Sequence, residues 1–338
     1  MNKKMTSQQI ADHLGISRST LSFIINGKSK EMRISDELTK TTLDYVKSIN
    51  YKTNSIAKSL KTGKSHTIGL IVADISNPFF SQIAYRLEKE SSKRGYYIMY
   101  SSSNENEDQF NLQLENFINR QLDGLILVPP VNCFDFVEIL NTKRIPFVMI
   151  DRSFEGSMVN SVNIDNFRAA YEATNRFIKN NKKNIAIINV NDQLLTMHNR
   201  TKGYLQCLSD NNIQANKKLI KQIKFSNAVK DVKNAVEEVV QNGANAILFT
   251  TNKLCFSGLE KLKEMGNVIP DDIAVISFDD NPAFKLFDTS VTTIKQPIKE
   301  MCKASIDILF DLIDNNDISR SPIQLEFEAS LILRNSCI

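Results

Sequence analysis

The chain has 338 residues, of which 42% are hydrophobic and 24% are charged. This composition is that of a folded globular protein, and it excludes an intrinsically disordered or collagen-like chain. The net charge of +4 is unevenly distributed: residues 1–66 contain 12 basic and 5 acidic residues, net +7, and the remainder contains 30 and 33, net −3. A basic N-terminal module on a slightly acidic body favours a polyanionic partner for that module alone.

Five cysteines are scattered along the chain without a CxxC pair or a neighbouring histidine cluster. An odd, scattered set indicates reduced thiols, and it offers no metal-ligand spacing. No apolar run reaches the roughly twenty residues of a membrane span, and the start MNKKMTSQQ lacks the apolar core of a signal peptide. We therefore expect a cytoplasmic protein with no bound metal and no membrane partner.

The segment from Met5 to Gly27 predicts two short helices joined by a tight turn. Thr6 opens a capping-box pattern, and Ser17 is placed to cap the second helix. Ala11 is small enough to lie where the helices touch, and Gly15 tolerates the positive φ of the turn. The outer edge of the second helix is short, polar and basic. This pattern is typical of a helix-turn-helix, and the alternative is an ordinary helical hairpin.

Two further elements complete the basic region. A third helix is predicted from about Ser35 to Asn50. Four aliphatic residues are expected on its inner face: Leu38, Leu43, Val46 and Ile49. The segment 51–65 then carries one short helix pattern that Asn54 can cap. Because two helical turns are marginal alone, we expect this helix to form on a partner, and the alternative is a flexible basic linker.

From Thr67 onward, short apolar runs alternate with helical patterns. The first series is TIGLIVA, YYIMYSS, GLILVPP and FVMID, and the second is NIAIINV, LIKQIKF, AILFTT and IAVISF. Strand-like runs separated by helices predict parallel sheets. Two series in tandem predict two α/β lobes with a ligand cleft at the carboxyl ends of the strands. VTTIKQP, a long helix at about 298–314 and the β-type segment LEFEASLIL complete the chain.

Several motifs follow one another in a fixed order: IADHLGISRSTLS, NSIAKSL, DISNPFF, LDGLILVPP, IPFVMIDR, VNIDNFRAA, RTKGY, IPDDIAVISFDD and TTIKQP. Together they resemble the lactose-repressor (LacI/GalR) family of bacterial transcription regulators over essentially the whole chain. The resemblance implies an α-helical helix-turn-helix headpiece that binds DNA, a hinge helix, and a two-lobed, periplasmic-binding-protein-like α/β core with parallel sheets. Such a core dimerises and senses a small molecule.

The resemblance also sets the expected domain boundaries. The headpiece is expected at 1–53, the hinge helix and linker at 54–66, and the core at 67–338. Within the core, the N-lobe is expected at about 67–162 plus 291–320. The C-lobe is expected at about 163–290 plus the C-terminal segment.

The DNA contacts implied by the resemblance lie in the headpiece and the hinge: Thr6, Ser17, Arg18, Ser19, Thr20, Phe23, Asn26, Arg33, Asn54, Ala57, Lys58 and Leu60. Arg18 begins the recognition helix and is expected to contact a guanine edge, or otherwise a phosphate. Phe23 stands where many relatives have arginine, and it is expected on a thymine methyl group or, with the helix phase off by one, in the core. Leu60 resembles a leucine that wedges into the minor groove, with hinge-to-hinge packing as the alternative. Basic residues expected on phosphates are Lys3, Lys4, Arg33, Lys58 and Lys61.

The implied effector contacts lie at strand ends and helix starts of both lobes: Phe79, Asp165, Thr196, Arg200, Phe225, Asn252, Lys253, Asp279 and Gln296. Arg200 can pair with a carboxylate or phosphate, and the two aspartates can accept from sugar hydroxyl groups. The alternatives are structural: Asp279 or Asp280 can cap a short helix near Pro282, and Arg200 can pair with Asp165. Glu105 with Glu107 or Asp108 is expected to form a solvated helix start, and the alternative is a metal or acid pair.

Lys253 stands where relatives that bind neutral sugars commonly carry aspartate. With Arg200 it would give the cleft two cationic donors, so we expect an anionic effector such as a sugar acid or a phosphorylated sugar. The alternative is that Lys253 points out of the cleft and is a solvated residue at a helix start.

These features predict a sequence-specific DNA-binding transcription regulator, most simply a repressor of carbohydrate-utilisation genes that a small effector controls. Its expected partners are a palindromic operator, the effector and a second copy of the chain in a homodimer; a co-regulator protein is unknown. The rival hypothesis is the solute-binding protein of a sugar transporter, which would need an export signal and lack the basic headpiece. Because GxGxxG, P-loop and GxSxG patterns are absent, we expect no enzyme activity, no catalytic residues and no cofactor.

Overall fold

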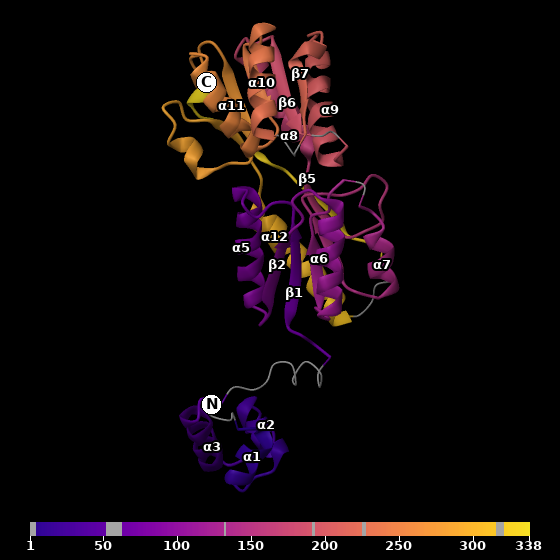
Figure 1. The fold of residues 1–338 in the computed structure, drawn as a ribbon, viewed down its shortest axis with the longest axis vertical. Coiled ribbons are helices and arrows are strands. Elements are labelled where there is room, and N and C mark those ends of the chain that lie inside the picture. The colour runs from indigo at the N-terminus through magenta and orange to yellow at the C-terminus, as the bar shows by residue number, and fades with distance from the viewer. Residues whose placement is uncertain (1–4, 52–62, 132, 191–192, 225–227, 316–320) are drawn as a thin grey trace. The chain divides into compact units, whose positions relative to one another are not determined.

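The structure is a computed structural model that describes residues 5–51, 63–131, 133–190, 193–224, 228–315 and 321–338. The chain divides into two compact units, Met1–Ser65 and His66–Ile338 (Figure 1). Each unit has its own hydrophobic core. In the described part of the chain, no helix is long and apolar enough to cross a membrane.

The described residues of the first unit form three helices: α1 (Ser7–His13), α2 (Arg18–Ile25) and α3 (Asp36–Ser48). The predicted capping box begins α1, because the Thr6 hydroxyl accepts from the Gln9 backbone and the Gln9 side chain accepts from the Thr6 backbone. Gly15 has a φ of +66° in the turn that follows. A residue with a Cβ is strained in this conformation, so the glycine permits the tight turn between α1 and α2.

One position of α3 differs from the predicted inner face. Leu43 is 43% exposed, whereas Thr42 is fully buried. Thr42, Val46 and Ile49 are related by i, i+4 and i+7 spacing and therefore share one face of the helix. Val46 and Ile49 pack against the core of α1 and α2, as expected. The prediction for Leu43 was wrong because the positions of the apolar residues do not determine the rotation of this helix about its axis. Turning the helix by one position exchanges Leu43 for Thr42 on the inner face.

The second unit contains two lobes, each built on a six-stranded sheet. The first sheet has the order β11-β5-β4-β3-β1-β2, and all its strand pairs are parallel. Its strands are β1 (Thr67–Val72), β2 (Tyr97–Ser102), β3 (Gly124–Leu127), β4 (Phe147–Ile150), β5 (Ser161–Ile164) and β11 (Gln324–Phe327). β5 was not among the predicted strands, because a four-residue segment with an internal asparagine carries little apolar signal.

The second sheet has the order β12-β10-β9-β8-β6-β7, in which the outer strand β12 is antiparallel and the other pairs are parallel. Its strands are β6 (Ile185–Val190), β7 (Ile220–Ile223), β8 (Ala246–Phe249), β9 (Ala274–Phe278), β10 (Thr292–Lys295) and β12 (Ser330–Ile332). Both sheets are thus predominantly parallel, and the predicted fold class of the core is confirmed.

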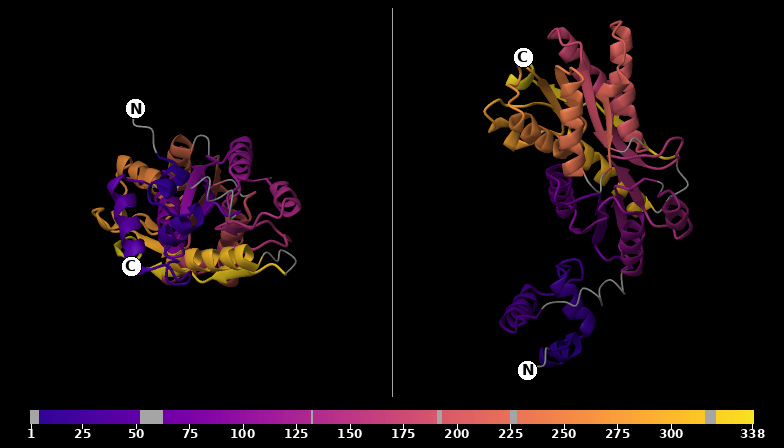
Figure 2. Two further views of the ribbon diagram at one scale, coloured as in Figure 1. Left: turned by 90° about the horizontal axis from the view of Figure 1, so that it is seen from below. Right: turned by 45° about the horizontal axis from the view of Figure 1, so that its top comes forward.

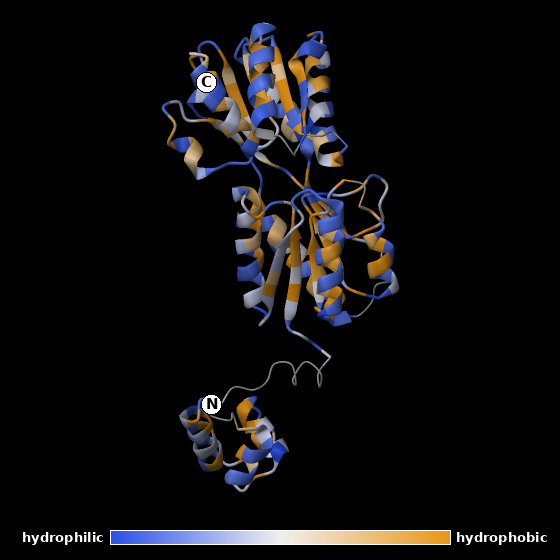
Figure 3. Cartoon of the chain, in the orientation of Figure 1, coloured by the Kyte–Doolittle hydropathy of each residue, from blue (hydrophilic) through white to orange (hydrophobic). Residues whose placement is uncertain are grey.

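Helices cover both faces of each sheet (Figures 1 and 2). The first sheet is covered by α5 (Pro78–Ser92), α6 (Glu107–Asn119), α7 (Phe136–Thr142) and α12 (Ile298–Asn315), and the second by α8 (Asn166–Lys179), α9 (Leu195–Asp210), α10 (Ala228–Gln241) and α11 (Asn252–Glu264). Consecutive residues of β1 show the two faces: Leu70 packs in one cluster with α5, and Ile71 packs in another with α6. Strands buried on both faces read as continuous apolar runs, as Figure 3 shows.

The expected lobe boundaries need two corrections. β10 pairs with β9 in the second sheet, although 291–320 was expected in the first lobe; of that segment, α12 packs on the first sheet. β11 pairs with β5 in the first sheet, although the C-terminal segment was expected in the second lobe. The chain therefore crosses between the lobes after β5, after β10 and after β11. Apolar alternation identifies such short strands but does not reveal which sheet they join.

α8 and α9 approach each other closely at Gly203. A Cβ at this position would lie 2.1 Å from the backbone oxygen of Phe167 in α8. No real side chain fits at that distance, so only glycine permits this helix contact. The contact fixes the start of α8 against α9, and it thereby positions Asn166 and Arg200 at the edge of the second sheet.

Candidate functional site

A cavity of about 440 Å³ lies between the two lobes at the carboxyl ends of the strands. Its lining comes from the loops after β1, β2 and β4 in the first lobe, and from α9, α11 and the segments after β9 and β10 in the second. In open α/β sheets this edge is the usual place for a ligand, and the volume suits a small molecule.

Three helices begin at this cavity, and each is capped by a polar side chain. Asn77 accepts from the Phe79 backbone at the start of α5 at 3.0 Å, and Asn106 accepts from the Gln109 backbone at the start of α6 at 2.8 Å. Thr251 accepts from the Leu254 backbone at the start of α11 at 3.3 Å. The partial positive charges of three helix N-termini therefore converge on the cavity and favour acidic or hydroxyl-bearing groups there.

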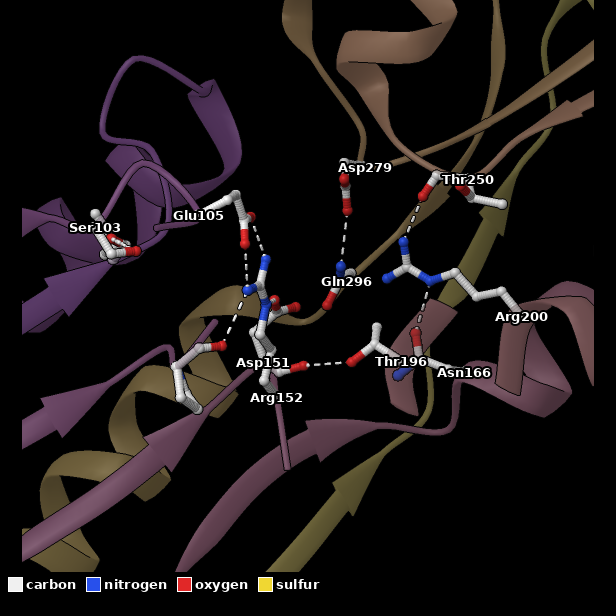
Figure 4. A network of polar contacts seen from close by, with 12 residues as sticks. Ser103, Glu105, Asp151, Arg152, Asn166, Thr196, Arg200, Thr250, Asp279 and Gln296 are labelled. Carbon is white, nitrogen blue, oxygen red and sulfur yellow. Dashed lines mark hydrogen bonds and ion pairs between the residues drawn. The ribbon is translucent and has the colours of Figure 1, made fainter. Parts of the chain in front are cut away.

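A buried ion pair forms one wall. Arg152 donates to both carboxylate oxygens of Glu105, at 2.7 and 2.5 Å, and to the backbone oxygen of Pro129 at 3.0 Å (Figure 4). The side chains of Arg152 and Glu105 are only 6% and 12% exposed. Glu105 was expected to be solvated, and this prediction was wrong. Glu105 lies in the loop after β2, and this loop places its carboxylate beside Arg152, which follows β4.

Asp151, directly before that arginine, is 7% exposed and has a φ of +68°. Burial raises the pKa of its carboxyl to about 6, although the cations Arg152 and Arg200 act in the opposite direction. Asp279 and Glu105 raise it further. The Asp151 backbone oxygen accepts a hydrogen bond from Thr196 of the second lobe at 3.1 Å. The cavity thus contains a carboxyl group that titrates near neutral pH.

Arg200 is almost completely buried, at 2% exposed, and its side chain is held by several contacts. Its Nε donates to Asn166 at 2.8 Å, one Nη donates to the Thr250 backbone oxygen, and its guanidinium lies 3.9 Å from the centre of the Phe278 ring. Within the described residues, its second Nη has no hydrogen-bond partner. A planar donor fixed in this way is suited to a carboxylate, a phosphate or a hydroxyl group in the cavity.

Asp279 lies opposite, with a φ of +67°. Gln296 donates to its carboxylate at 2.7 Å, and burial raises the pKa of Asp279 against the effects of Arg200 and Gln296. The Oε1 of Gln296 and the Oδ1 of Asn252 are buried, and within the described residues neither atom has a hydrogen-bond partner. Unsatisfied buried acceptors are costly, so a ligand that donates hydrogen bonds to these two atoms would be stabilised in the cavity.

Besides the bond from Thr196 to Asp151, two further contacts join the lobes beside the cavity. Lys253 donates to an Asp74 carboxylate oxygen at 3.3 Å, and Asn252 donates to Asn77 at 3.1 Å. The Lys253 side chain is 53% exposed. It lines the cavity and is paired across the cleft, so it does not stand as the unpaired second cation that the sequence suggested.

The first unit presents a second candidate surface at the start of α2. Ser17 caps this helix by accepting from the Thr20 backbone at 3.0 Å, and its hydroxyl also contacts the hydroxyl groups of Ser19 and Thr20. Arg18 and Ser19 are exposed. Among the described residues, the Arg18 side chain has no ion pair or hydrogen bond, so its guanidinium can reach outward. Phe23 is half-buried, and it lies outside the cluster that forms the core of this unit.

Comparison with known proteins identifies the architecture. The family model described as periplasmic binding proteins and sugar binding domain of LacI family matches residues 65–330. The chain belongs to the LacI family. The HTH-type transcriptional regulator RegA of Clostridium saccharobutylicum is 25% identical over 337 residues, covering 98% of each chain. The predicted family is therefore confirmed.

Two solved structures resemble the LacI-family chain over almost its whole length. The lac repressor dimer bound to operator and the anti-inducer ONPF is 19% identical, with a TM-score of 0.87 over 99% of this chain and 100% of that chain. A complex of the transcriptional regulator CelR with cellobiose is 22% identical, with a TM-score of 0.72 over 98% and 99% of the two chains. At these identities the likeness shows the shared fold.

Five of the predicted effector residues line the cavity of this LacI-family core: Phe79, Arg200, Lys253, Asp279 and Gln296. Thr196 and Asn252 are buried beside it, where they bridge the lobes. Asp165 is different, because it caps α8 by accepting from the Arg168 backbone at 2.8 Å and borders a separate pocket of about 110 Å³. Phe225 lies outside the described residues.

Neither structural alternative weighed for these residues occurs. Asn281, rather than Asp279 or Asp280, caps the short helix η3 (Pro282–Lys285). Asn166, rather than Asp165, accepts from Arg200.

The sequence reasoning missed several residues of the cavity wall: Asp74, Asn77, Glu105, Asp151 and Arg152. All follow strands of the first sheet, and IPFVMIDR places a charged pair directly after an apolar run. That position is the signal that could have identified Asp151 and Arg152, because the ends of parallel strands meet at one edge.

Among the predicted DNA contacts, Arg18, Ser19, Asn26 and Arg33 are exposed, and Thr20 and Phe23 are partly exposed. Thr6 and Ser17 are exposed, but their hydroxyl groups cap α1 and α2. Asn54, Ala57, Lys58 and Leu60 lie outside the described residues, as do Lys3, Lys4 and Lys61. The four hinge contacts therefore remain predictions from the sequence.

Proposed function

We propose that this LacI-family chain is a sequence-specific DNA-binding transcription repressor whose operator affinity is controlled by a small effector bound between the two lobes. The observation that carries the proposal is the combination of two features in one chain. A basic helix-turn-helix presents an unpaired arginine at the start of its second helix, and a separate unit encloses a polar cavity. A transporter's solute-binding protein has no use for the first feature, so we favour the repressor over that alternative.

The proposed DNA interface centres on the N-terminal end of α2. In helix-turn-helix proteins this end of the recognition helix meets base edges in the major groove. Arg18 can donate two hydrogen bonds to a guanine. Ser17 and Thr6 cap helix N-termini, where backbone amides and hydroxyl groups suit phosphates. Phe23 is partly exposed on the same helix and is proposed to contact a thymine methyl group.

We propose a homodimer because one recognition helix reads only half of an operator. The open edge of the first sheet offers a surface for a second copy. Tyr97 and Tyr100 on the edge strand β2 are 78% and 62% exposed, and Tyr85 on the adjacent helix α5 is 49% exposed. Exposed aromatic residues gathered at a strand edge are typical of an interface core. The lac repressor of similar fold was solved as an operator-bound dimer.

We propose a carbohydrate derivative as the effector and carbohydrate-utilisation genes as the targets. The CelR complex shows a regulator of this fold with cellobiose. In the present cavity, four carboxylates (Asp74, Glu105, Asp151 and Asp279) face three cations (Arg152, Arg200 and Lys253). Two of the cations are paired with Glu105 and Asp74. Among the described residues, Arg200 is the cavity cation that forms no ion pair, and it keeps one nitrogen for an acidic group, so a sugar acid with one charge suits the cavity better than a doubly charged phosphate.

The DNA-binding part is tested by selecting bound duplexes from a random pool with the full-length protein. We expect enrichment of an inverted repeat, and the affinity should fall steeply with salt because each phosphate contact contributes roughly −0.9 to the logarithmic slope. Arg18→Ala should relax the preference at one symmetric pair of positions. A bound pool without an enriched repeat at physiological salt would reject sequence-specific binding by this protein.

The effector part is tested by thermal unfolding in the presence of neutral sugars, sugar acids and sugar phosphates. A ligand at about one hundred times its dissociation constant adds roughly 2.7 kcal/mol to stability. A hit should also change affinity for the selected operator, and a repressor released by inducer should lose it. Stabilisation without any effect on DNA binding would leave a sugar-binding protein that is not a regulator.

A further inference from the structure

Two adjacent polar contacts close the cavity of the core on one side. They are the ion pair between Lys253 and Asp74 and the hydrogen bond from Asn252 to Asn77, which join residues 179 and 175 positions apart. Asp74 and Asn77 belong to the loop between β1 and α5 of the first lobe. The other two residues form the first turn of α11 in the second lobe. Both contacts therefore require the lobes to be closed at this side of the cleft.

The Asp74 carboxylate is pre-oriented for its partner. One oxygen accepts from the Ser76 backbone at 2.9 Å and from the Ser76 hydroxyl at 2.6 Å. The second oxygen is left to accept from Lys253. Burial raises the pKa of Asp74, but the bonds from Ser76 and the charge of Lys253 outweigh it, so that the pKa is lowered. Because Ser76 already fixes this side chain, pairing costs less conformational entropy than it does for a freely rotating carboxylate.

Lys253 occupies a position that does not favour a lysine. It lies in the first turn of α11, which contains no acidic residue. A cation at a helix N-terminus faces the positive end of the helix dipole and is disfavoured there. The helix start already has its cap in Thr251. The stabilising contact of this lysine is therefore with the other lobe and not with its own helix.

We infer that the pair of Asp74 and Lys253 is a latch that favours the closed cleft before any effector binds. The inference rests on the proposed function in one respect, because closure is taken as the step that the effector stabilises. An effector that binds the closed form gains affinity in proportion to the closed fraction. The latch thus sets the sensitivity of the sensor, and an aspartate at position 253 would instead repel Asp74.

The latch is weak and sensitive to salt, because its side chains are 53% and 25% exposed. Pairs of this exposure change an equilibrium by about two- to fivefold. The ion pair of Arg152 with Glu105 is buried and lies within one lobe, so it persists when the cleft opens. Among the described residues, we therefore expect ionic strength to act on closure through the latch.

The test measures lobe closure in ligand-free, full-length protein by single-molecule energy transfer. All five native cysteines are buried, so labels can be placed at Glu88→Cys on α5 and Lys230→Cys on α10. Asp74→Asn keeps an acceptor for Ser76 and removes the charge, and Lys253→Met keeps the length of the side chain. At low salt each substitution should lower the closed-to-open ratio about two- to fivefold. The double variant should be no more open than either single variant.

Lys263→Met is the matched control, because Lys263 is an exposed lysine in the last turn of the same helix. It should leave closure unchanged. Raising the salt concentration to about 1 M should open the wild type and leave Lys253→Met unaffected, since screening is then nearly complete. Unchanged closure in both single variants, or additive opening in the double variant, would overturn the latch. Neither DNA nor effector enters the measurement, so its outcome is independent of the tests of the proposed function.

Discussion

The buried carboxyl of Asp151 makes the core less stable at neutral pH than it would be with an uncharged side chain. Its pKa is raised from 3.8 to about 6 because burial disfavours the carboxylate. The folded protein therefore binds more protons than the unfolded chain between these two values. Stability from this group is fully present at low pH and is lost as the pH rises through the folded pKa. Asp151→Asn removes the titration and keeps the size of the side chain.

The magnitude follows from the two pKa values. At a pH of about 7.5 the ionised group costs about 3 kcal/mol, and at a pH of about 4.5 it costs about 1 kcal/mol. Relative to wild type, Asp151→Asn should therefore gain about 2 kcal/mol more stability at the higher pH. Groups that do not interact with Asp151 titrate equally in the two proteins, so the difference reports this carboxyl together with its coupling to its charged neighbours. The four charged groups that influence it are Arg152, Arg200, Asp279 and Glu105.

Urea unfolding followed by circular dichroism at both pH values measures this difference. Glu155→Gln is the control, because Glu155 is exposed in the same connection between β4 and β5. It should change stability by less than about 0.5 kcal/mol at either pH. The reasoning is refuted if Asp151→Asn changes the free energy of unfolding by the same amount at both pH values. That result would mean that water or a counter-charge keeps Asp151 ionised at no cost.

Three further substitutions test the packing and the DNA interface. Gly203→Ala should destabilise the core by about 1–3 kcal/mol in urea unfolding because its Cβ meets the backbone of Phe167, whereas the exposed Lys202→Ala should be neutral; equal effects would contradict the close approach. Arg18→Ala should weaken binding to the selected operator about tenfold or more and relax one base preference, and a uniform loss on all sequences would indicate a phosphate contact instead. Leu60→Ala should weaken specific binding more than non-specific binding in a shift assay, and equal losses would argue against a minor-groove wedge.

Local features of the fold could be predicted because they depend on neighbouring residues. The capping box at Thr6, the turn at Gly15 and the cap at Ser17 each involve residues within four positions. Most strands of the two sheets could be predicted, because burial on two faces requires continuous apolar runs in the central strands, whereas the short strand β5 could not. The lobe to which β10 or β11 belongs could not be predicted, since strand pairing is decided by the crossovers and not by the strand itself.

The position of the cavity could be predicted from the sequence, but the hydrogen-bond partners of its residues could not. Strand ends and helix starts identify the residues that meet there, and five of the predicted residues line it. Which of these side chains accepts a hydrogen bond from which donor depends on small differences in the backbone. Asp165 faces its own helix start because it caps α8, whereas Asn166, the next residue, accepts from Arg200. A shift of one residue at a helix N-terminus is enough to exchange a ligand contact for a cap.

Charged residues are easily counted in a sequence, but their ion-pair partners are difficult to predict from it. Lys253 suggested an anionic effector because the sequence shows a cation without a local partner. In the fold, Asp74, which lies 179 positions away in the sequence, forms an ion pair with Lys253 across the cleft. The argument for an anion then depends on the one free nitrogen of Arg200, set among three helix N-termini and an excess of one carboxylate. A single ligand charge can be paired by Arg200, whereas a second would lie close to Asp151 or Asp279 and would require one of them to be protonated. Binding of a doubly charged ligand should therefore take up a proton, and binding of a neutral sugar should not.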